Sequence, residues 1–211
     1  MTVCFTVFCF TYAQVLLRVK KIDITTGFFY LVREESNVEV AVEFVKLEGG
    51  AGYLLRQNAK DYVVLSVYLK EKDGIAVQTM LADKGEHTQL LYIGANTLYF
   101  KTRKEKKNAA LYVGALQIMH SCMEVFNCVI TMLEDGATQE SVKRILFPLS
   151  SQFEYLAKEY ENVYPDFSAV CYYFAEIINE YCAEILFVSD LRYVLCLMAE
   201  EYLSLASAFS I

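Results

Sequence analysis

Hydrophobic and polar positions alternate in short runs over the first half of the chain. Residues 62–69 and 75–81 are apolar runs on either side of Asp73-Gly74, and Asp-Gly between two such runs is typical of a β-hairpin. Residues 38–47 are rich in β-branched side chains in partial alternation, which favours another strand. Further runs of this kind cover 3–10, 14–19, 26–33, 53–56, 88–93 and 97–102. The pattern predicts about seven to nine strands with short antiparallel connections, as a sheet or a small barrel.

From about Asn108 the apolar positions repeat with a period near 3.6, which indicates helices. The first helix continues to the break at Gly136, and Thr138 is a suitable N-cap for a second. We expect Pro148 to kink this second helix or to divide it in two. A third helix opens at Pro165, and Ser189 is a candidate N-cap for a fourth over 190–208. The second half therefore predicts a bundle of about three to five helices.

Together the two patterns predict an α+β fold, with an antiparallel β region at 1–104 and a helical region at 105–211. We expect the two regions to pack together as one compact unit. Hydrophobic residues make up 55% of the 211 residues and charged residues 21%, which excludes an intrinsically disordered chain.

The cysteines and the apolar segments bear on the compartment. The chain has 7 cysteines, an odd number, with no Cys-x-x-Cys pair, so we expect reduced, buried thiols rather than a disulfide framework. No basic residue precedes Arg18, so the apolar run at 3–10 lacks the positive start of a secretion signal. No apolar stretch reaches the roughly 20 residues of a membrane span. These features predict an intracellular, cytoplasmic protein without a transmembrane segment.

Charge divides between the two halves. The formal net charge is −7, but residues 1–104 carry +2 and residues 105–211 carry −9. The acidity therefore belongs to the helical half, and nucleic acid is disfavoured as a partner because an acidic chain repels phosphates.

Residues for catalysis are few. The chain has only 2 histidines, and His120 with Glu124 supplies at most half of a metal site. The glycine-rich segment 49–52 is followed by an apolar run typical of a strand, so it lacks the helix that a phosphate-binding loop requires. The sequence thus predicts no catalytic residues, no metal site and no cofactor.

Two charged clusters are candidates for binding. The first stands where the last strand meets the first helix and could contact an anionic membrane surface or an acidic protein face; it comprises Lys101, Arg103, Lys104, Lys106 and Lys107. The second repeats along the third helix at intervals of four, as Glu176, Glu180 and Glu184. Because like charges at this spacing repel, we expect a positive group opposite them, either the 101–107 segment or a partner.

Tyrosines on the last helices add to the second cluster. The chain contains 16 tyrosines, and those on the last helices cannot all share one buried face with Phe174 and Ile178; they are Tyr172, Tyr173, Tyr181, Tyr193 and Tyr202. Tyrosine is favoured at interfaces, so some of them, with Tyr172 and Tyr173 as the candidates, indicate a protein partner or a homo-oligomer.

The preferred function is a non-catalytic, intracellular protein-interaction or scaffolding module. An alternative is a carrier of a small molecule or lipid, with an apolar cavity inside the β region. A second alternative is an enzyme whose site forms only in three dimensions, by the convergence of His120 with a cysteine and a carboxylate.

Overall fold

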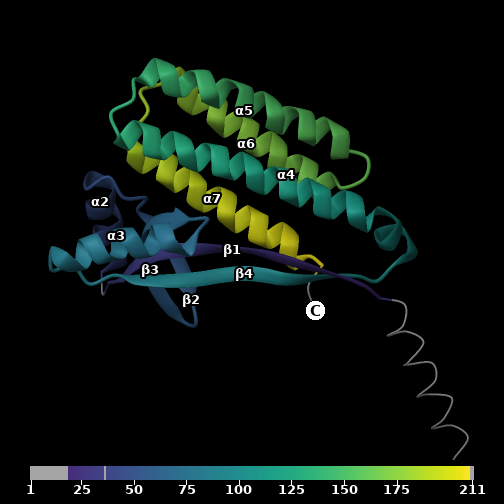
Figure 1. Cartoon of the computed structure of the whole chain (residues 1–211), viewed down its shortest axis with the longest axis horizontal. Coiled ribbons are helices and arrows are strands. Elements are labelled where there is room, and N and C mark those ends of the chain that lie inside the picture. Colours follow the sequence, from purple (N-terminus) through teal and green to yellow (C-terminus); the bar gives the residue numbers. More distant parts are fainter. Residues whose placement is uncertain (1–18, 36, 210–211) are drawn as a thin grey trace, which may run out of the picture.

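The computed structural model describes residues 19–35 and 37–209 and has an α+β fold. Four long helices, α4 to α7, lie over one face of a sheet (Figure 1). In chain order the elements are β1 (Lys20–Glu34), α2 (Val38–Leu47), β2 (Tyr53–Gln57), β3 (Lys60–Tyr68), α3 (Glu71–Asp83), β4 (Gln89–Phe100), α4 (Arg103–Glu134), α5 (Gln139–Tyr160), α6 (Pro165–Ala183) and α7 (Val188–Ser207).

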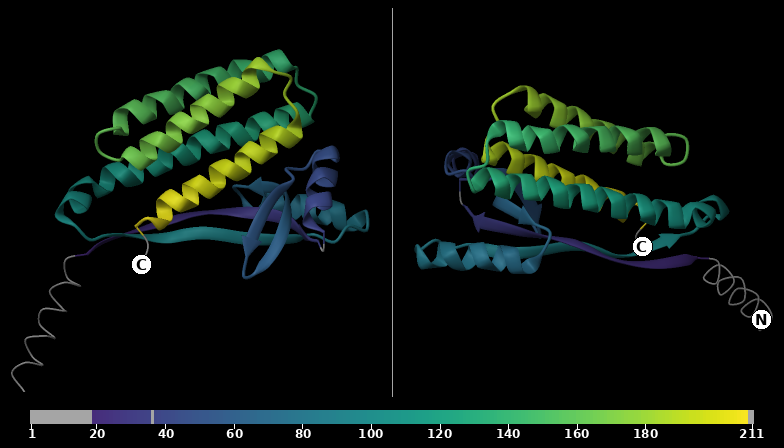
Figure 2. Two further views of the ribbon diagram at one scale, coloured as in Figure 1. Left: turned by 180° about the vertical axis from the view of Figure 1, so that it is seen from behind. Right: turned by 45° about the horizontal axis from the view of Figure 1, so that its top comes forward.

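The sheet has four strands in the order β2-β3-β1-β4, and every neighbouring pair is antiparallel. With its two helices it forms the β-α-β-β-α-β arrangement known as the split βαβ or ferredoxin-like motif. β1 and β4 pair from Lys20 opposite Phe100 to Val32 opposite Gln89. They form a long ribbon that continues beneath the helical bundle, while α2 and α3 gather at the other end (Figures 1 and 2).

The prediction of seven to nine strands and a barrel is wrong for the described residues. The sheet is open, with β2 and β4 at its edges. The runs at 88–93 and 97–102 belong to one strand, β4, because pairing with β1 continues across both. The expected strand at 3–10, and the one at 14–19 apart from its last residue, lie outside the described residues.

Residues 38–47 form a helix, α2, instead of the predicted strand. Asn37 is its N-cap, with the side chain accepting a hydrogen bond from the Val40 N–H. The helix ends in a glycine turn, where Gly49 has a φ of +86° and the Gly50 N–H donates to the Val45 carbonyl at 2.8 Å. The end signals outweigh the β-branched composition.

Residues 75–81 also form a helix instead of the predicted strand, because α3 begins at Glu71. Asp73-Gly74 lies in its first turn and is not a hairpin. A Cβ on Gly74 would stand 2.7 Å from Leu90 Cδ1, so the glycine lets α3 approach the sheet here without displacing the Leu90 side chain.

The sheet is covered on both faces. Phe28, Tyr30 and Val32 belong to the core shared with the bundle, and Leu31 between them is buried on the opposite face. Leu90 is the cross-strand partner of Leu31, so both side chains lie on this opposite face. Gly74 of α3 contacts Leu90, which places α3 on the same face. The α4–α7 bundle therefore covers one face of the sheet and α3 lies on the other, while α2 contacts both β3 and α7.

The prediction of C-terminal helices is confirmed. The Thr138 hydroxyl accepts from the Ser141 N–H at 3.3 Å at the start of α5, and Pro165 occupies the first turn of α6. Pro148 lies within α5, which continues to Tyr160 without the predicted break into two helices. α7 begins two residues earlier than expected, at Val188, with Phe187 rather than Ser189 as its N-cap.

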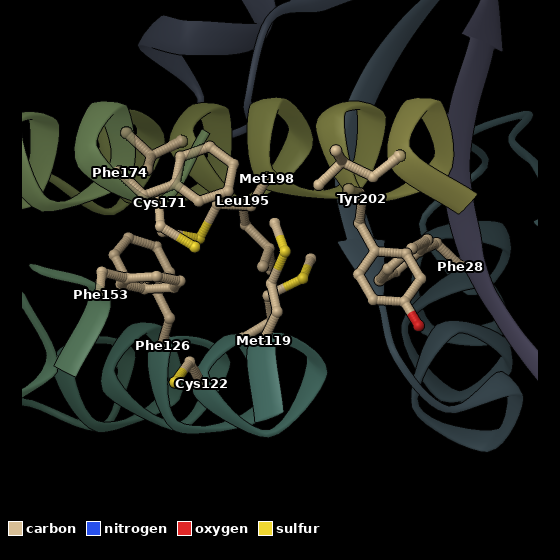
Figure 3. Close-up of a cluster of buried hydrophobic side chains, with 14 of the residues drawn as sticks. Phe28, Met119, Cys122, Phe126, Phe153, Cys171, Phe174, Leu195, Met198 and Tyr202 are labelled. Atoms are coloured by element: carbon tan, nitrogen blue, oxygen red, sulfur yellow. The ribbon is translucent and has the colours of Figure 1, made fainter. Parts of the chain in front are cut away.

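Aromatic and sulfur-containing side chains join the sheet to the bundle. The rings of Phe28 and Tyr202 meet edge to face with centroids 5.4 Å apart, which connects β1 to α7. Farther inside, Met119, Phe126 and Cys171 pack among side chains from all four bundle helices (Figure 3). Buried residues of the sheet and of the helices form one continuous core.

Candidate interaction surface

A surface of tyrosines and carboxylates extends across β2, α6 and α7. We call it the acidic tyrosine face, and it consists of Tyr53, Tyr173, Glu180, Tyr181, Tyr193, Glu200 and Glu201. The rings of Tyr53 and Tyr193 lie 5.5 Å apart, and the Tyr53 hydroxyl donates a hydrogen bond to Glu200. Burial, followed by this hydrogen bond, raises the pKa of Tyr53 above its usual value.

Electrostatic coupling joins α6 to α7 on this face. Burial raises the pKa of Tyr173, and Tyr193, Glu201 and Glu180 raise it further. Burial likewise raises the pKa of Tyr181, with Asp190, Tyr193, Glu180 and Glu184 adding to it. Because the charged and phenolic groups of α6 and α7 influence one another's pKa, the two helices form one region of negative electrostatic potential.

One cation already contacts this face. Lys46 Nζ, from α2, lies 5.4 Å from the centroid of the Tyr193 ring, within the range of a cation–π interaction. The contact shows that the surface accepts an ammonium group against a tyrosine whose neighbours are carboxylates.

The structure brings together part of the predicted acidic site. Tyr173 and Glu180 belong to the acidic tyrosine face, and Glu176 and Tyr172 are exposed on the same helix. Glu184 is the C-cap of α6, and its carbonyl accepts from Lys143. The sequence already suggests Tyr193 as one of the tyrosines of the last helices, but it gives no sign of Tyr53 or Glu201, because only the packing of β2 and α7 places them beside α6.

The basic cluster lies at the far end of α6 from these glutamates. The Tyr164 hydroxyl donates to the Asn108 carbonyl at 3.0 Å, which places the beginning of α6 beside the beginning of α4. Within 19–35 and 37–209, no ion pair joins Glu176, Glu180 or Glu184 to the 101–107 segment. The internal pairing expected from the sequence is therefore not formed.

A capping box stabilises the basic cluster at the start of α4. The Thr102 hydroxyl accepts from the Glu105 N–H at 3.1 Å, and the Glu105 carboxylate accepts from the N–H groups of Thr102 and Lys101. Desolvation acts to raise the pKa of Glu105, but these hydrogen bonds outweigh it and lower the pKa. Lys101, Arg103, Lys104 and Lys107 are exposed around this box, and Lys106 is partly buried.

A groove of about 830 Å³ lies between α3 and the second half of α4. The Arg192 guanidinium closes one side, since it donates to the Gly49 carbonyl at 2.7 Å and to the Glu134 carboxylate. Lys70 and Glu124 line the groove and form an ion pair of 3.9 Å. The charges of the groove are thus largely compensated internally. No sequence signal indicated it, because its residues come from distant segments.

His120 does not line this groove. Its ring packs against Phe28 and Tyr202, with centroid distances of 6.1 and 6.0 Å. Burial raises the pKa of the neighbouring Cys122 thiol to about 11, so this cysteine is protonated near neutral pH. Among the described residues, no group of three or more His, Cys, Asp or Glu side chains could hold a metal ion.

His120 makes stability depend on pH. Burial lowers its pKa, and the opposing effect of Glu124 is smaller. The unfolded chain therefore binds this proton more tightly, and stability is lost as pH falls below about 6.5, the pKa of an unperturbed histidine. Between about pH 7.5 and 5.5, we expect the free energy of unfolding to fall less in His120→Phe than in the wild type, as measured by urea unfolding.

His87→Gln is the matched control for this prediction, because His87 is exposed before β4. Equal losses in the wild type and His120→Phe would show that His120 does not cause the dependence.

Comparisons with models of protein families, with curated proteins and with solved structures find no match.

Proposed function

We propose that the protein is a non-catalytic, intracellular interaction module that binds a basic segment of another protein on the acidic tyrosine face. The observation that carries the proposal is the position of Lys46 Nζ over Tyr193, where a cation already meets the tyrosine rings among carboxylates. Lysine and arginine side chains of a partner would use the same chemistry. The buried, unpaired cysteines Cys122, Cys171, Cys182 and Cys196 suit a reducing compartment.

The geometry favours a protein segment as the ligand. The face spans β2, α6 and α7, which suits an extended or helical segment with several basic side chains. Tyr173 and Glu180 on one helix and Tyr193 and Glu201 on the next give it both apolar area and charge. Tyrosine supplies contact area with few rotatable bonds, so little entropy is lost on binding.

The test uses a fluorescent 12-residue peptide of alternating lysine, arginine and tyrosine, titrated with the protein at two salt concentrations. We expect Glu180→Lys combined with Glu201→Lys to weaken binding by about tenfold or more, since exposed charge pairs each contribute up to about 1 kcal/mol and both signs are reversed. Tyr173→Ala should weaken binding at both salt concentrations, because it removes contact area rather than charge.

The control is Glu159→Lys combined with Glu154→Lys, which makes the same change in net charge on α5. If the control weakens binding as much as the α6–α7 variant, the peptide responds to overall charge and the proposed face is wrong. Failure of the wild type to bind the peptide contradicts the proposal as well.

A further inference from the structure

The helix α4 has two apolar faces, and only one is buried. One face packs into the core through residues such as Tyr112, Met119 and Phe126. On the other side Leu111, Ile118 and Val125 are 44%, 40% and 42% exposed. They recur every seven residues and continue to Met132, a spacing that is typical of a helix–helix seam.

Small residues alternate with the large ones along this exposed seam. Gly114, Ser121 and Cys128 each stand three positions after a large residue. A Cβ on Gly114 would meet nothing within 4 Å, so the protein itself does not require glycine there. Glycine inside a helix costs about 1 kcal/mol relative to alanine, and an approaching helix is a reason to keep it.

A groove of about 430 Å³ runs beside the seam between α4 and α5. α4 contributes Ile118, Ser121 and Val125 to its lining, and α5 contributes Pro148 and Leu149. The lining bears no charged side chain. Since α5 leaves this side of α4 open, the groove and the seam form one apolar surface.

We propose that this surface is the interface of a homodimer in which α4 packs antiparallel against α4 of a second copy. With a two-fold axis near the middle of the helix, a residue of one copy lies opposite a residue of the other copy whenever their two residue numbers add up to the same total. Leu111 then faces the partner's Cys128, and Ile118 faces the partner's Ser121. Gly114 faces the partner's Val125. Every layer sets a large side chain against a small one, as close packing requires.

Charge selects the same arrangement. Lys104 precedes Leu111 by one heptad, and Asp135 follows Cys128 by one heptad, so both continue the seam at its ends. Antiparallel packing opposes Lys104 to the partner's Asp135, and both side chains are exposed. A parallel pair would oppose lysine to lysine and Leu111 to the partner's Leu111. The seam is therefore complementary to itself in one direction only.

A lipid surface is the other class of occupant for an exposed apolar helix. α4 is long and apolar enough by composition to cross a membrane, and less than half of its most apolar window is buried inside the protein. Lipid chains do not distinguish large from small side chains, so the alternation of sizes favours a second copy of this chain.

The first test is Gly114→Leu in the full chain, measured by light scattering and sedimentation. The added side chain meets open space in one copy but overfills the layer opposite the partner's Val125. We expect a folded monomer by circular dichroism, with the dimer weakened by about 100-fold or more, because the clash occurs in two equivalent layers. Ala169→Leu, an exposed position on α6, is the control and should remain dimeric.

The second test measures direction. Leu111→Cys places a thiol opposite the partner's Cys128, which is exposed, and mild oxidation should join them as a dimer. Gln117→Cys, outside the seam, keeps the chain's other thiols and should not cross-link.

A wild type that is monomeric at high micromolar concentration overturns the proposal. So does a dimer that Gly114→Leu leaves intact. A third outcome also overturns it. If the wild type floats with vesicles of neutral and anionic phospholipid, and Gly114→Leu binds the vesicles equally well, the surface binds lipid instead.

Discussion

Phe28→Ala is expected to remove about 3–5 kcal/mol from the free energy of unfolding, as for other large aromatic residues in cores. Phe28 is fully buried, and its ring packs against Tyr202 from α7 and His120 from α4. Its loss opens a cavity between the sheet and the bundle. Because domains are stable by only about 5–15 kcal/mol, the loss is a large share of the total. Guanidinium unfolding followed by circular dichroism measures it.

Phe147→Ala is the matched control for this prediction. Phe147 lies on α5 and is 53% exposed, so its removal leaves no cavity and is expected to change stability by less than about 1 kcal/mol. A cost below about 1 kcal/mol for Phe28→Ala would contradict the packing of the sheet on the bundle.

Gly52→Ala is the second substitution with a large expected effect. Gly52 has a φ of +56°, and a Cβ there would stand 2.7 Å from the Val42 carbonyl oxygen. The left-handed backbone alone costs a residue with a side chain about 1–3 kcal/mol. The contact with the carbonyl adds to this cost, because Val42 is held in α2 and cannot move without distorting the helix. Thermal and urea unfolding measure the sum.

Gly49→Ala separates the two contributions. Gly49 also has a positive φ, +86°, but a Cβ there meets nothing within 4 Å. It should therefore cost less than Gly52→Ala, and the difference measures the contact with α2. Equal costs would show that the contact does not matter.

The helical half could be predicted from the sequence because each helix carries its own signals. Thr138 and Pro165 mark the beginnings of α5 and α6, and the apolar positions repeat through each helix. Such signals act within a few residues, so they need no knowledge of the tertiary structure. Pro148 does not divide α5, which continues past it to Tyr160, so of the two expected effects of this proline the break into two helices does not occur.

The secondary structure of the first half was harder to predict, because two of its sequence patterns fit both a strand and a helix. Residues 38–47 hold so many apolar side chains that they fit both a strand and a helix, and only Asn37 and Gly49 at the ends decide for α2. Gly74 follows an aspartate and therefore resembles a hairpin turn. In the structure Gly74 lies against Leu90, which belongs to a strand that follows it in the chain, and no local signal predicts that contact.

The candidate site was partly predictable for a similar reason. Glu176 and Glu180 stand out because they repeat on one helix, and Tyr173 lies about one turn before Glu176 on the same helix. Tyr53 is separated from Tyr193 by most of the chain, and only the order of the strands and the packing of α7 bring the two rings together. A repeated spacing of residues within one helix can be predicted from the sequence, whereas contacts between side chains of distant elements cannot.

The long β1–β4 ribbon has a consequence for folding kinetics. Its pairs join residues up to 80 positions apart, as in Lys20 opposite Phe100, whereas α5 and α6 pack as neighbours joined by a short turn. Closing a long loop costs entropy before its contacts form, while a helical hairpin closes locally. The hairpin can therefore form early, and the ribbon, on which the bundle packs, sets the pace at which the whole chain reaches its native state.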